Sequence, residues 1–335
     1  MQRTRIALVG LGLAVAPHAR SLLDLAERAE VVWAATRSRE RADAFFNAYG
    51  FPVTTNIEAA ISDPSVEAVF VLTPPNAHAD VALAALAHGK HVLLEKPLDA
   101  SLDRARKIVE TAEGLKLTLG VVLQHRFREA ALRLTEIIAA GGLGRIEMAS
   151  VTVPWWRPQS YYDEPGRGTL ARDGGGVLIT QAIHPLDLFR SLVDPVEVVA
   201  AQTATTGLHR METEDYAAAL VRVAGGAPGT VIATTAFYPG DPERIEIAGT
   251  LGSARIAGNR LHVRYLSGET EEVGSQTGSG GGADPMDFAP DAHRRLIVDF
   301  LDAIAEGRPP RASGREALRS QVLIDAILGE AASRV

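Results

Sequence analysis

The stretch IALVGLGLAVAPHA, residues 6–19, decides how the first part of this chain folds. An apolar run is followed by Gly10, by Gly12 and then by a segment that can form a helix. A strand, a glycine turn and a helix in this order suit a dinucleotide: the first glycine permits the turn, the second lets the backbone approach a phosphate, and the helix amides face its charge. Val15 stands where a third glycine or alanine would pack helix against strand, so it alters packing rather than phosphate contact. The stretch predicts a dinucleotide-binding turn, with Leu13 as a further cofactor contact.

The same stretch has a second interpretation, because Arg3 and Arg5 before a short apolar run and small residues resemble a secretory signal. Gly10 and Gly12 interrupt that run where a signal would carry leucines. We therefore favour the dinucleotide turn.

The composition limits the class of protein. A chain of 335 residues predicts about two domains, and 46% hydrophobic with 22% charged residues is typical of a soluble globular protein. No apolar run is long enough to span a membrane, and the net charge of -7 leaves no basic stripe for nucleic acid. The absence of cysteine excludes disulfides, thiolate catalysis and cysteine-bound metal, and it agrees with a reducing cytoplasm. We expect a cytoplasmic protein that binds neither membranes nor nucleic acid.

Two patterns of apolar runs divide the chain. Up to residue 123, runs such as EVVWAAT and VEAVFVLTP alternate with helical patterns, as in a parallel sheet with crossover helices. We predict a doubly wound α/β Rossmann domain over residues 1–123.

From residue 124 to 335, strand-like runs follow one another with few helices between them. This pattern predicts an α+β domain with a large, mostly antiparallel open sheet, which binds substrate and mediates oligomerisation. A helix over residues 177–192 would cover one face and a second subunit the other. The last helices, near residues 291–306 and 315–332, are expected to pack back on the first domain. The glycine-rich segment 274–285 is expected to be a mobile loop, with a lid as the alternative.

The end of the second strand selects the cofactor. An acid there would bind the ribose 2′-hydroxyl of NAD, but Thr36 and Arg37 follow the strand instead. A guanidinium forms charge-assisted bonds to a 2′-phosphate, which a carboxylate would repel. The sequence favours NADP(H), with NAD(H) as the alternative. Solvation of the next helix would be the structural explanation of this arginine.

The fifth strand ends in VLLEKP, with Glu95, Lys96 and Pro97. Charged residues at the carboxyl end of a buried parallel strand lie in the crevice where such sheets bind ligands. A lysine there can polarise a carbonyl or stabilise an alkoxide. We expect Lys96 to take part in catalysis.

Three segments together carry a family resemblance: GLG...H at residues 10–18, TPPNAHADVALAALAHGKHVLLEKP at residues 73–97, and DGGGVLITQAIHPLDL at residues 173–188. The chain resembles the Gfo/Idh/MocA oxidoreductases over essentially its whole length. The resemblance implies a Rossmann domain followed by a domain whose open sheet makes homodimers or homotetramers. It also implies oxidation or reduction of sugars, cyclitols and their derivatives.

The resemblance assigns the catalytic pair. Lys96 matches the lysine near the reacting carbon, and His184 matches the general acid/base of many members. The chemistry asks for such a pair, because oxidising an alcohol also removes its hydroxyl proton, and a histidine titrating near neutrality can accept it. A core histidine bonded to backbone is the alternative for His184.

Two residues depart from the family pattern. Thr180 stands four residues before His184, where many members have an aspartate, and Ala182 replaces a frequent glycine. A carboxylate contact to substrate is therefore in doubt at Thr180. Gln181 and Asp187 are candidates to compensate, and Asp187 shares a helix face with His184 and would orient its imidazole.

The remaining candidates follow from position and residue type. Loops after the fourth and sixth strands are expected to line the cofactor or substrate, and the PWWRPQSYY segment offers an arginine among aromatic rings that suit a polyhydroxylated ligand. The cofactor candidates are Thr73, Pro74, Asn76, His78, Glu95, Lys96 and Gln124; the substrate candidates are Lys96, Arg126, Arg157, Thr180, Gln181 and His184. No close set of histidines and acids has ligand spacing, so no metal is expected.

The sequence thus predicts an NADP(H)-preferring oxidoreductase that moves a hydride between nicotinamide and an alcohol, ketone or aldehyde of a sugar, sugar derivative or cyclitol. Two alternatives stay open: a glycoside hydrolase that retains its nicotinamide cofactor, and a non-catalytic dinucleotide sensor.

Overall fold

The computed structural model describes residues 3–12, 14–274 and 291–333. The chain forms two compact units. One comprises Met1–Gln124 and Pro290–Leu318, and the other comprises His125–Ala289 and Arg319–Val335.

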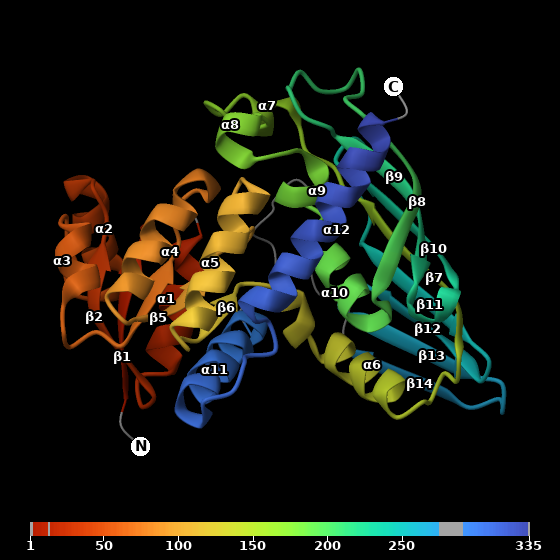
Figure 1. The fold of residues 1–335 in the computed structure, drawn as a ribbon, viewed down its shortest axis with the longest axis horizontal. Helices are drawn as coiled ribbons and strands as arrows, with labels where there is room; N and C mark the ends of the chain where they lie inside the picture. Colours follow the sequence, from red (N-terminus) through yellow and green to blue (C-terminus); the bar gives the residue numbers. More distant parts are fainter. Residues whose placement is uncertain (1–2, 13, 275–290, 334–335) are drawn as a thin grey trace. The chain divides into compact units, whose positions relative to one another are not determined.

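The first unit contains a six-stranded parallel sheet in the order β3-β2-β1-β4-β5-β6 (Figure 1). Of its two central strands, β4 is apolar and buried throughout, and β1 is apolar and buried from Ile6 to Val9, as crossover helices require. This order reverses between β1 and β4, the point where open α/β sheets bind ligands. The strands are β1 (Thr4–Val9), β2 (Ala29–Ala35), β3 (Val53–Thr54), β4 (Ala68–Val71), β5 (His91–Leu94) and β6 (Leu119–Val121). The helices are α1 (Val15–Asp24), α2 (Arg39–Tyr49), α3 (Ile57–Ser62), α4 (His78–Ala87), α5 (Leu102–Gly114) and α11 (Asp291–Glu306), with the 3-10 turn η1 (Pro75–Ala77).

Residues 291–318 complete this unit, and α12 (Gly314–Ala332) belongs to the second unit from Arg319 onward. Helix α11 packs against α1 and buries Leu296, Ile297 and Phe300. The chain then runs beside β6, where the Val121 amide donates to the Ala312 carbonyl at 2.8 Å. The Rossmann sheet predicted from the sequence is thus confirmed.

The second unit contains an eight-stranded sheet in the order β14-β13-β12-β11-β7-β10-β9-β8. All neighbouring strands are antiparallel except β7 and β10, which run parallel. The predicted large, mostly antiparallel sheet is therefore confirmed. Its strands are β7 (Ile146–Pro154), β8 (Pro195–Ala204), β9 (Tyr216–Val223), β10 (Pro228–Thr234), β11 (Arg244–Gly249), β12 (Gly252–Ala257), β13 (Arg260–Tyr265) and β14 (Thr270–Gly274).

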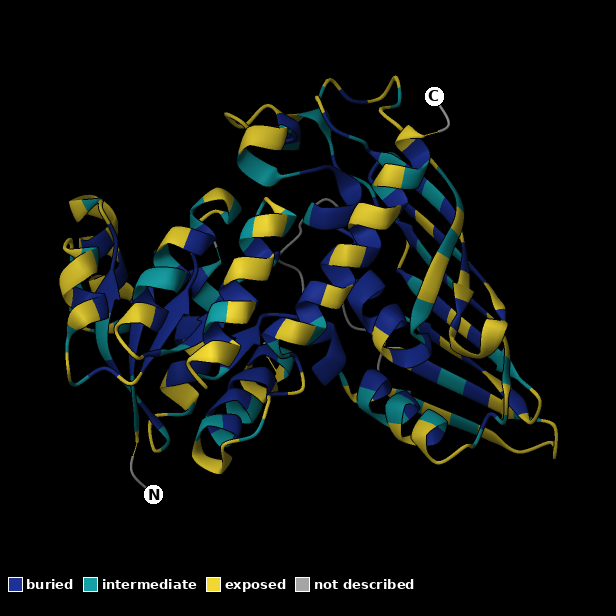
Figure 2. Cartoon of the chain, viewed as in Figure 1, coloured by how far each residue is buried: buried dark blue, intermediate teal, exposed yellow. Residues whose placement is uncertain are grey.

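Helices cover one face of this sheet. Figure 1 shows α10 (Ile183–Val193) and α6 (Glu129–Ala139) on the same side; α10 packs on β7 and β11, and α6 packs along β12, β13 and β14. Burial alternates along the strands (Figure 2): Ala149 and Val151 of β7 are buried beneath the helices, while Met148 is exposed on the other face. The remaining elements are η2 (Gln124–Phe127), η3 (Ala224–Gly226), α7 (Gln159–Tyr162), α8 (Leu170–Asp173), α9 (Val177–Thr180) and α12 (Gly314–Ala332).

The single helix expected over residues 177–192 is wrong in one respect, because it breaks into α9 and α10. The cause is Pro185, which has no amide hydrogen and whose ring would clash with the carbonyl of residue 181 in a continuous helix. A break before Ile183 places Pro185 in the first turn of α10, where proline is tolerated.

Candidate active site

The glycine turn of the first unit fits a pyrophosphate. Gly10 has φ of +102°, and a Cβ there would lie 2.7 Å from the carbonyl carbon of Leu72, which directly follows strand β4. A Cβ on Gly12 would meet no atom within 4 Å, so this glycine borders open space. Among the described residues, no acid lies in the first turn of α1 and no side chain caps it, so no negative charge there opposes an anion. Leu13, predicted as a cofactor contact, lies outside the described residues.

Two predicted residues follow β2. Thr36 is buried and its amide donates to the Thr54 carbonyl at 3.1 Å. Arg37 is exposed, and Ser38 then caps helix α2 by accepting from the Arg41 amide. Arg39 is held by Asp43 at 3.0 Å. Within the described residues Arg37 makes no such contact, so its guanidinium is available at the edge of the sheet.

His78 ties the loop after β4 to the loop after β5. Its imidazole is fully buried, with Nε2 2.7 Å from the Thr73 carbonyl and Nδ1 2.8 Å from the Pro97 carbonyl. Burial lowers the pKa of His78, against the pull of the two carbonyls. This histidine therefore fixes the position of Thr73 relative to the turn that follows Lys96.

Three further predicted residues lie after strands β4 and β6. Pro74 and Asn76 are exposed beside Thr73, and Gln124 follows β6. The Thr73 hydroxyl and Gln124 Oε1 are buried, and neither finds a hydrogen-bond partner in the part of the chain that is described. Buried polar atoms of this kind need a partner, and a bound dinucleotide amide or ribose can supply one. The first unit thus fits the cofactor that its turn predicts.

His18, on helix α1, holds Glu95. The buried His18 Nε2 lies 2.8 Å from Glu95 Oε1, and the other carboxylate oxygen accepts from the Lys96 amide at 3.1 Å. His293 of α11 meets the His18 ring edge-on, with centroids 5.5 Å apart. Burial alone would raise the pKa of Glu95. The hydrogen bond from His18 and the charges of His18, His293 and Lys96 outweigh this effect, so the pKa of Glu95 lies below its usual range. The carboxylate beside Lys96 is therefore ionised and fixed.

The second unit presents His184 near the start of α10. Its ring is 8% exposed and stacks on His125 of η2, with centroids 5.1 Å apart and planes 24° apart. His125 Nε2 accepts from Arg128, which also donates to Glu243 at 2.6 Å. Two adjacent imidazoles are thus enclosed with an ion pair.

Asp187 does not orient His184, contrary to our expectation. Arg126 donates to both of its carboxylate oxygens, at 2.6 and 2.7 Å, and the Ser320 hydroxyl donates to one of them at 2.6 Å. Asp187 has no exposed surface, and an isolated buried charge would be strongly unfavourable. The buried Arg126 guanidinium supplies the counter-charge. Arg126, a predicted substrate contact, is thereby locked beside α10.

Arg157 forms the other polar cluster of this unit. It is 1% exposed, donates to Gln181 Oε1 at 3.0 Å, and lies over the rings of Trp155 and Tyr161. Gln181 in turn donates to the Tyr161 hydroxyl at 2.7 Å. The structure brings these two predicted substrate residues together, with Arg157 behind the amide of Gln181.

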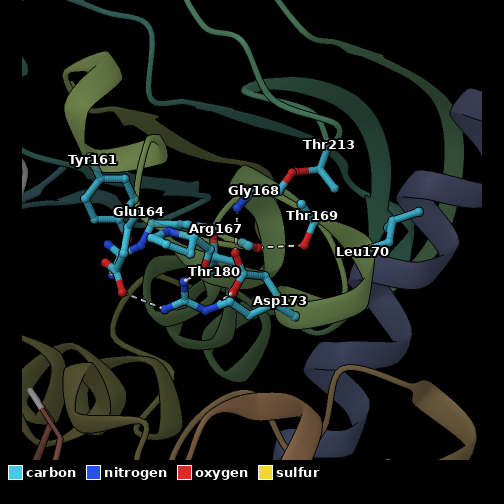
Figure 3. Close-up of polar contacts among 12 residues, drawn as sticks. Tyr161, Glu164, Arg167, Gly168, Thr169, Leu170, Asp173, Thr180 and Thr213 are labelled. Carbon is cyan, nitrogen blue, oxygen red and sulfur yellow. Dashed lines mark hydrogen bonds and ion pairs between the residues drawn. The ribbon is translucent and has the colours of Figure 1, made fainter.

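Thr180 is the last residue of α9, and polar contacts link residues of the segment before this helix (Figure 3). Its hydroxyl donates to the Gly176 carbonyl at 2.7 Å. Arg172 pairs with Glu164 at 2.9 Å, Asp173 accepts from the Gly168 amide at 2.7 Å, and the Arg167 guanidinium lies 4.0 Å from the Tyr161 ring centre. The Thr180 hydroxyl, at the position where the family resemblance implied a frequent aspartate, is thus bonded to the backbone.

Sequence reasoning did not name His125, Arg128 or Glu243 as site residues. His125 stands between Gln124 and Arg126, both of which were named, so its position after β6 was the available signal. Arg128 and Glu243 are 115 residues apart, and no local pattern joins them.

Other classes of site find no support among the described residues. No group of three or more histidines and acids there could hold a metal ion. No helix in that part of the chain combines the length and apolar character needed to cross a membrane.

A dinucleotide turn at the switch point of a parallel sheet, with a lysine after its fifth strand and a second unit that buries a histidine, describes a two-domain nicotinamide-dependent dehydrogenase. Residues 4–123 match the model of the oxidoreductase family with an NAD-binding Rossmann fold, and residues 131–255 match the Gfo/Idh/MocA C-terminal domain. The chain belongs to the Gfo/Idh/MocA family of oxidoreductases.

Known relatives agree along the whole chain. Inositol 2-dehydrogenase of Rhizobium meliloti (strain 1021) is 26% identical over 341 residues, covering 98% of this chain and 97% of the relative. The 1,5-anhydro-D-fructose reductase of Ensifer adhaerens is 30% identical over 303 residues, covering 87% and 85%. The WlbA dehydrogenase of Bordetella pertussis, solved with NADH and UDP-GlcNAcA, is 29% identical, with a TM-score of 0.84 and coverage of 100% and 98%. The relatives named here are dehydrogenases and reductases of sugars and cyclitols, and this chain is an oxidoreductase of the same family.

Proposed function

We propose that this enzyme prefers NADP(H) and interconverts an alcohol with a ketone or aldehyde on a sugar, sugar derivative or cyclitol. The observation that carries the cofactor preference is Arg37. It follows the buried Thr36 at the end of β2, it is exposed, and its neighbour Arg39 is occupied by Asp43. A 2′-phosphate at this edge would meet a cation and no carboxylate directly after the strand.

Binding of the two cofactors tests this preference. NADPH and NADH affinities are measured by quenching of protein fluorescence for the wild type, Arg37→Ala and the matched control Arg39→Ala. Because a hydrogen bond to a charged group contributes about 1.5–3 kcal/mol, Arg37→Ala is expected to weaken NADPH about 10- to 100-fold. NADH binding and the control should change less than about twofold, as expected for exposed side chains. Equal binding of NADH and NADPH by the wild type would refute the preference and leave the family assignment intact.

In the proposed reaction, the bound nicotinamide supplies the hydride acceptor or donor. His184 takes the proton from the substrate hydroxyl in the oxidative direction and returns it in the reductive one. Lys96, fixed through the amide contact to Glu95, donates to the substrate oxygen and stabilises the negative charge that develops there. Gln181, oriented by Arg157, and Thr180 contact substrate hydroxyls, and Arg126 supports α10 beside them.

A panel of myo-inositol, D-glucose and D-fructose with either cofactor tests the reaction, with nicotinamide absorbance as the readout. Lys96→Ala and His184→Ala should each lower kcat about 10²- to 10⁴-fold, the usual contribution of such groups, and His184→Ala should change cofactor affinity less than twofold. Unchanged turnover in both variants would refute these roles. Release of nitrophenol from a nitrophenyl glycoside without net reduction would favour a hydrolase with retained cofactor.

We also propose a homodimer or homotetramer that pairs through the open face of the second sheet, in the cytoplasm. The support is the exposed apolar side chains of that face, among them Met148 of β7, Leu220 of β9 and Ile232 of β10, which alternate with buried neighbours. Sedimentation of the wild type and of Ile232→Lys tests the interface: the variant should become monomeric. A monomeric wild type would overturn the proposal.

A further inference from the structure

His125, whose ring stacks on that of His184, has no role in the proposed reaction. The two rings are nearly parallel at a centroid distance of 5.1 Å, and both are buried. Ring pairs at this separation attract one another, and stacking restrains the rotation of each ring about its side-chain bonds. The face of His125 thus defines the plane of the His184 imidazole.

The environment of His125 determines its protonation. A guanidinium carries only donors, so the nitrogen that meets Arg128, His125 Nε2, must be a bare acceptor. The proton therefore sits on Nδ1, which lies 3.9 Å from Glu243 Oε1. His125 is held as a neutral imidazole in one tautomer.

The Arg128–Glu243 pair explains how a permanent cation is tolerated there. Arg128 is 10% exposed and Glu243 3% exposed, and they bond at 2.6 Å. The carboxylate offsets the guanidinium, so the cation orients His125 without opposing a positive charge on His184. A protonated His125, by contrast, would place a like charge against protonated His184.

We propose that His125 is a positioning residue for His184: Arg128 and Glu243 hold it in one neutral tautomer, and its ring face aligns the His184 imidazole for proton transfer. This inference rests on the proposed role of His184. Its consequence is that His125 acts on the rate of the chemical step and not on cofactor affinity. Alignment matters because a displacement of about 1 Å at a reacting group can cost about a hundredfold in rate.

Steady-state kinetics on the panel sugar with the highest kcat/KM tests the proposal. His125→Ala removes the ring, His125→Phe keeps a flat face, and His88→Ala is the control, since His88 is an exposed partner of Glu58. His125→Ala should lower kcat about 10- to 100-fold, with KM and NADPH affinity changed less than twofold. His125→Phe should retain kcat within about threefold, and the control should match the wild type.

The same substitutions in a His184→Ala background separate alignment from general stability. If His125 acts through His184, His125→Ala should cost less than about twofold there, because coupled residues are not additive. An equal loss in both backgrounds overturns the proposal, as does an unchanged kcat in His125→Ala alone. If His184→Ala itself costs nothing, the proposed function fails first, which distinguishes the two failures.

A spectroscopic measurement keeps the proposal testable if the variants do not fold. Nitrogen NMR of ¹⁵N-histidine-labelled wild-type enzyme at pH 7.5 should show His125 with Nδ1 protonated and Nε2 bare. A proton on Nε2, in either the neutral or the charged ring, overturns it.

Discussion

The two units hold their own predicted site residues in different ways. In the first, the determining features are backbone: a glycine turn and a histidine that joins two main-chain carbonyls, one of them only five residues away in sequence. In the second, they are side-chain pairs between distant residues, such as Arg126 with Asp187, 61 residues apart, and Arg128 with Glu243, 115 apart. The stability of the first unit is therefore sensitive to added atoms, whereas that of the second unit is sensitive to lost charge.

Breaking the Asp187 pair should have the largest effect on stability. Asp187→Asn leaves the buried Arg126 guanidinium without its counter-charge, which typically costs about 3–5 kcal/mol of the free energy of unfolding. Urea denaturation of the wild type and variant measures it. Asp43→Asn, which breaks the exposed pair with Arg39, is the control and should stay within about 0.5 kcal/mol. A loss below about 1 kcal/mol for Asp187→Asn would show that charge pairing does not dominate the stability of the second unit.

Adding one methyl group to the glycine turn separates fold from binding. Gly10→Ala puts a Cβ against the Leu72 backbone at positive φ, so overpacking and strain together should cost about 2–4 kcal/mol of stability. Gly12→Ala fills open space instead, and we expect stability within about 1 kcal/mol but weaker NADPH binding. Thermal unfolding and cofactor titration read the two effects. Full NADPH affinity in Gly12→Ala would mean that the open space is not the pyrophosphate site.

Removing His18 tests the buried hydrogen bond between His18 and Glu95 in the first unit. His18→Leu leaves Glu95 without its donor, and an unsatisfied buried acceptor costs about 1–3 kcal/mol. Urea unfolding at pH 7 measures the loss. His91→Leu is a suitable comparison, since His91 is only partly buried and accepts from a backbone amide. Equal stability of His18→Leu and wild type would show that Glu95 is held by other contacts.

The smallest effect concerns Glu214, which accepts from the Gly176 and Leu178 amides. Burial raises the pKa of this carboxyl. The folded protein then binds more protons than the unfolded chain above the ordinary glutamate pKa, so this group lowers stability as pH rises through its folded pKa. Glu214→Gln should remove this pH dependence, which amounts to less than about 1 kcal/mol of the free energy of unfolding. The melting temperature of both proteins between pH 4.5 and 7.5 checks it, and a difference independent of pH would contradict the sign.

The sequence predicted the first unit well because its signals are local. Gly10, Gly12 and the strand that ends at Glu95 lie in patterns whose spacing reports the backbone directly. The break between α9 and α10 could have been anticipated from Pro185 by the same reasoning. The strand Gly252–Ala257 gives a weaker signal in the sequence, since its glycine, serine and alanines weaken the apolar alternation.

The partners in the second unit could not be predicted in this way. Asp187 does lie one turn after His184, as the helical spacing implied, but tertiary packing brings Arg126 to it. The choice between an imidazole and a guanidinium depends on burial, which a single sequence does not report. His125 shows the same limit, because its neighbour Arg128 is local whereas Glu243 and His184 are not.

Helix α1 carries both the turn that suits a pyrophosphate and, within its first turns, the His18 ring that grips Glu95. We expect a cofactor bound at this turn to steady helix α1 and, through His18, the carboxylate that accepts from the Lys96 amide. The exchange of that single amide with deuterated solvent should slow when NADPH binds. The Lys96 amide thus becomes a reporter of cofactor occupancy that needs no substrate and no turnover.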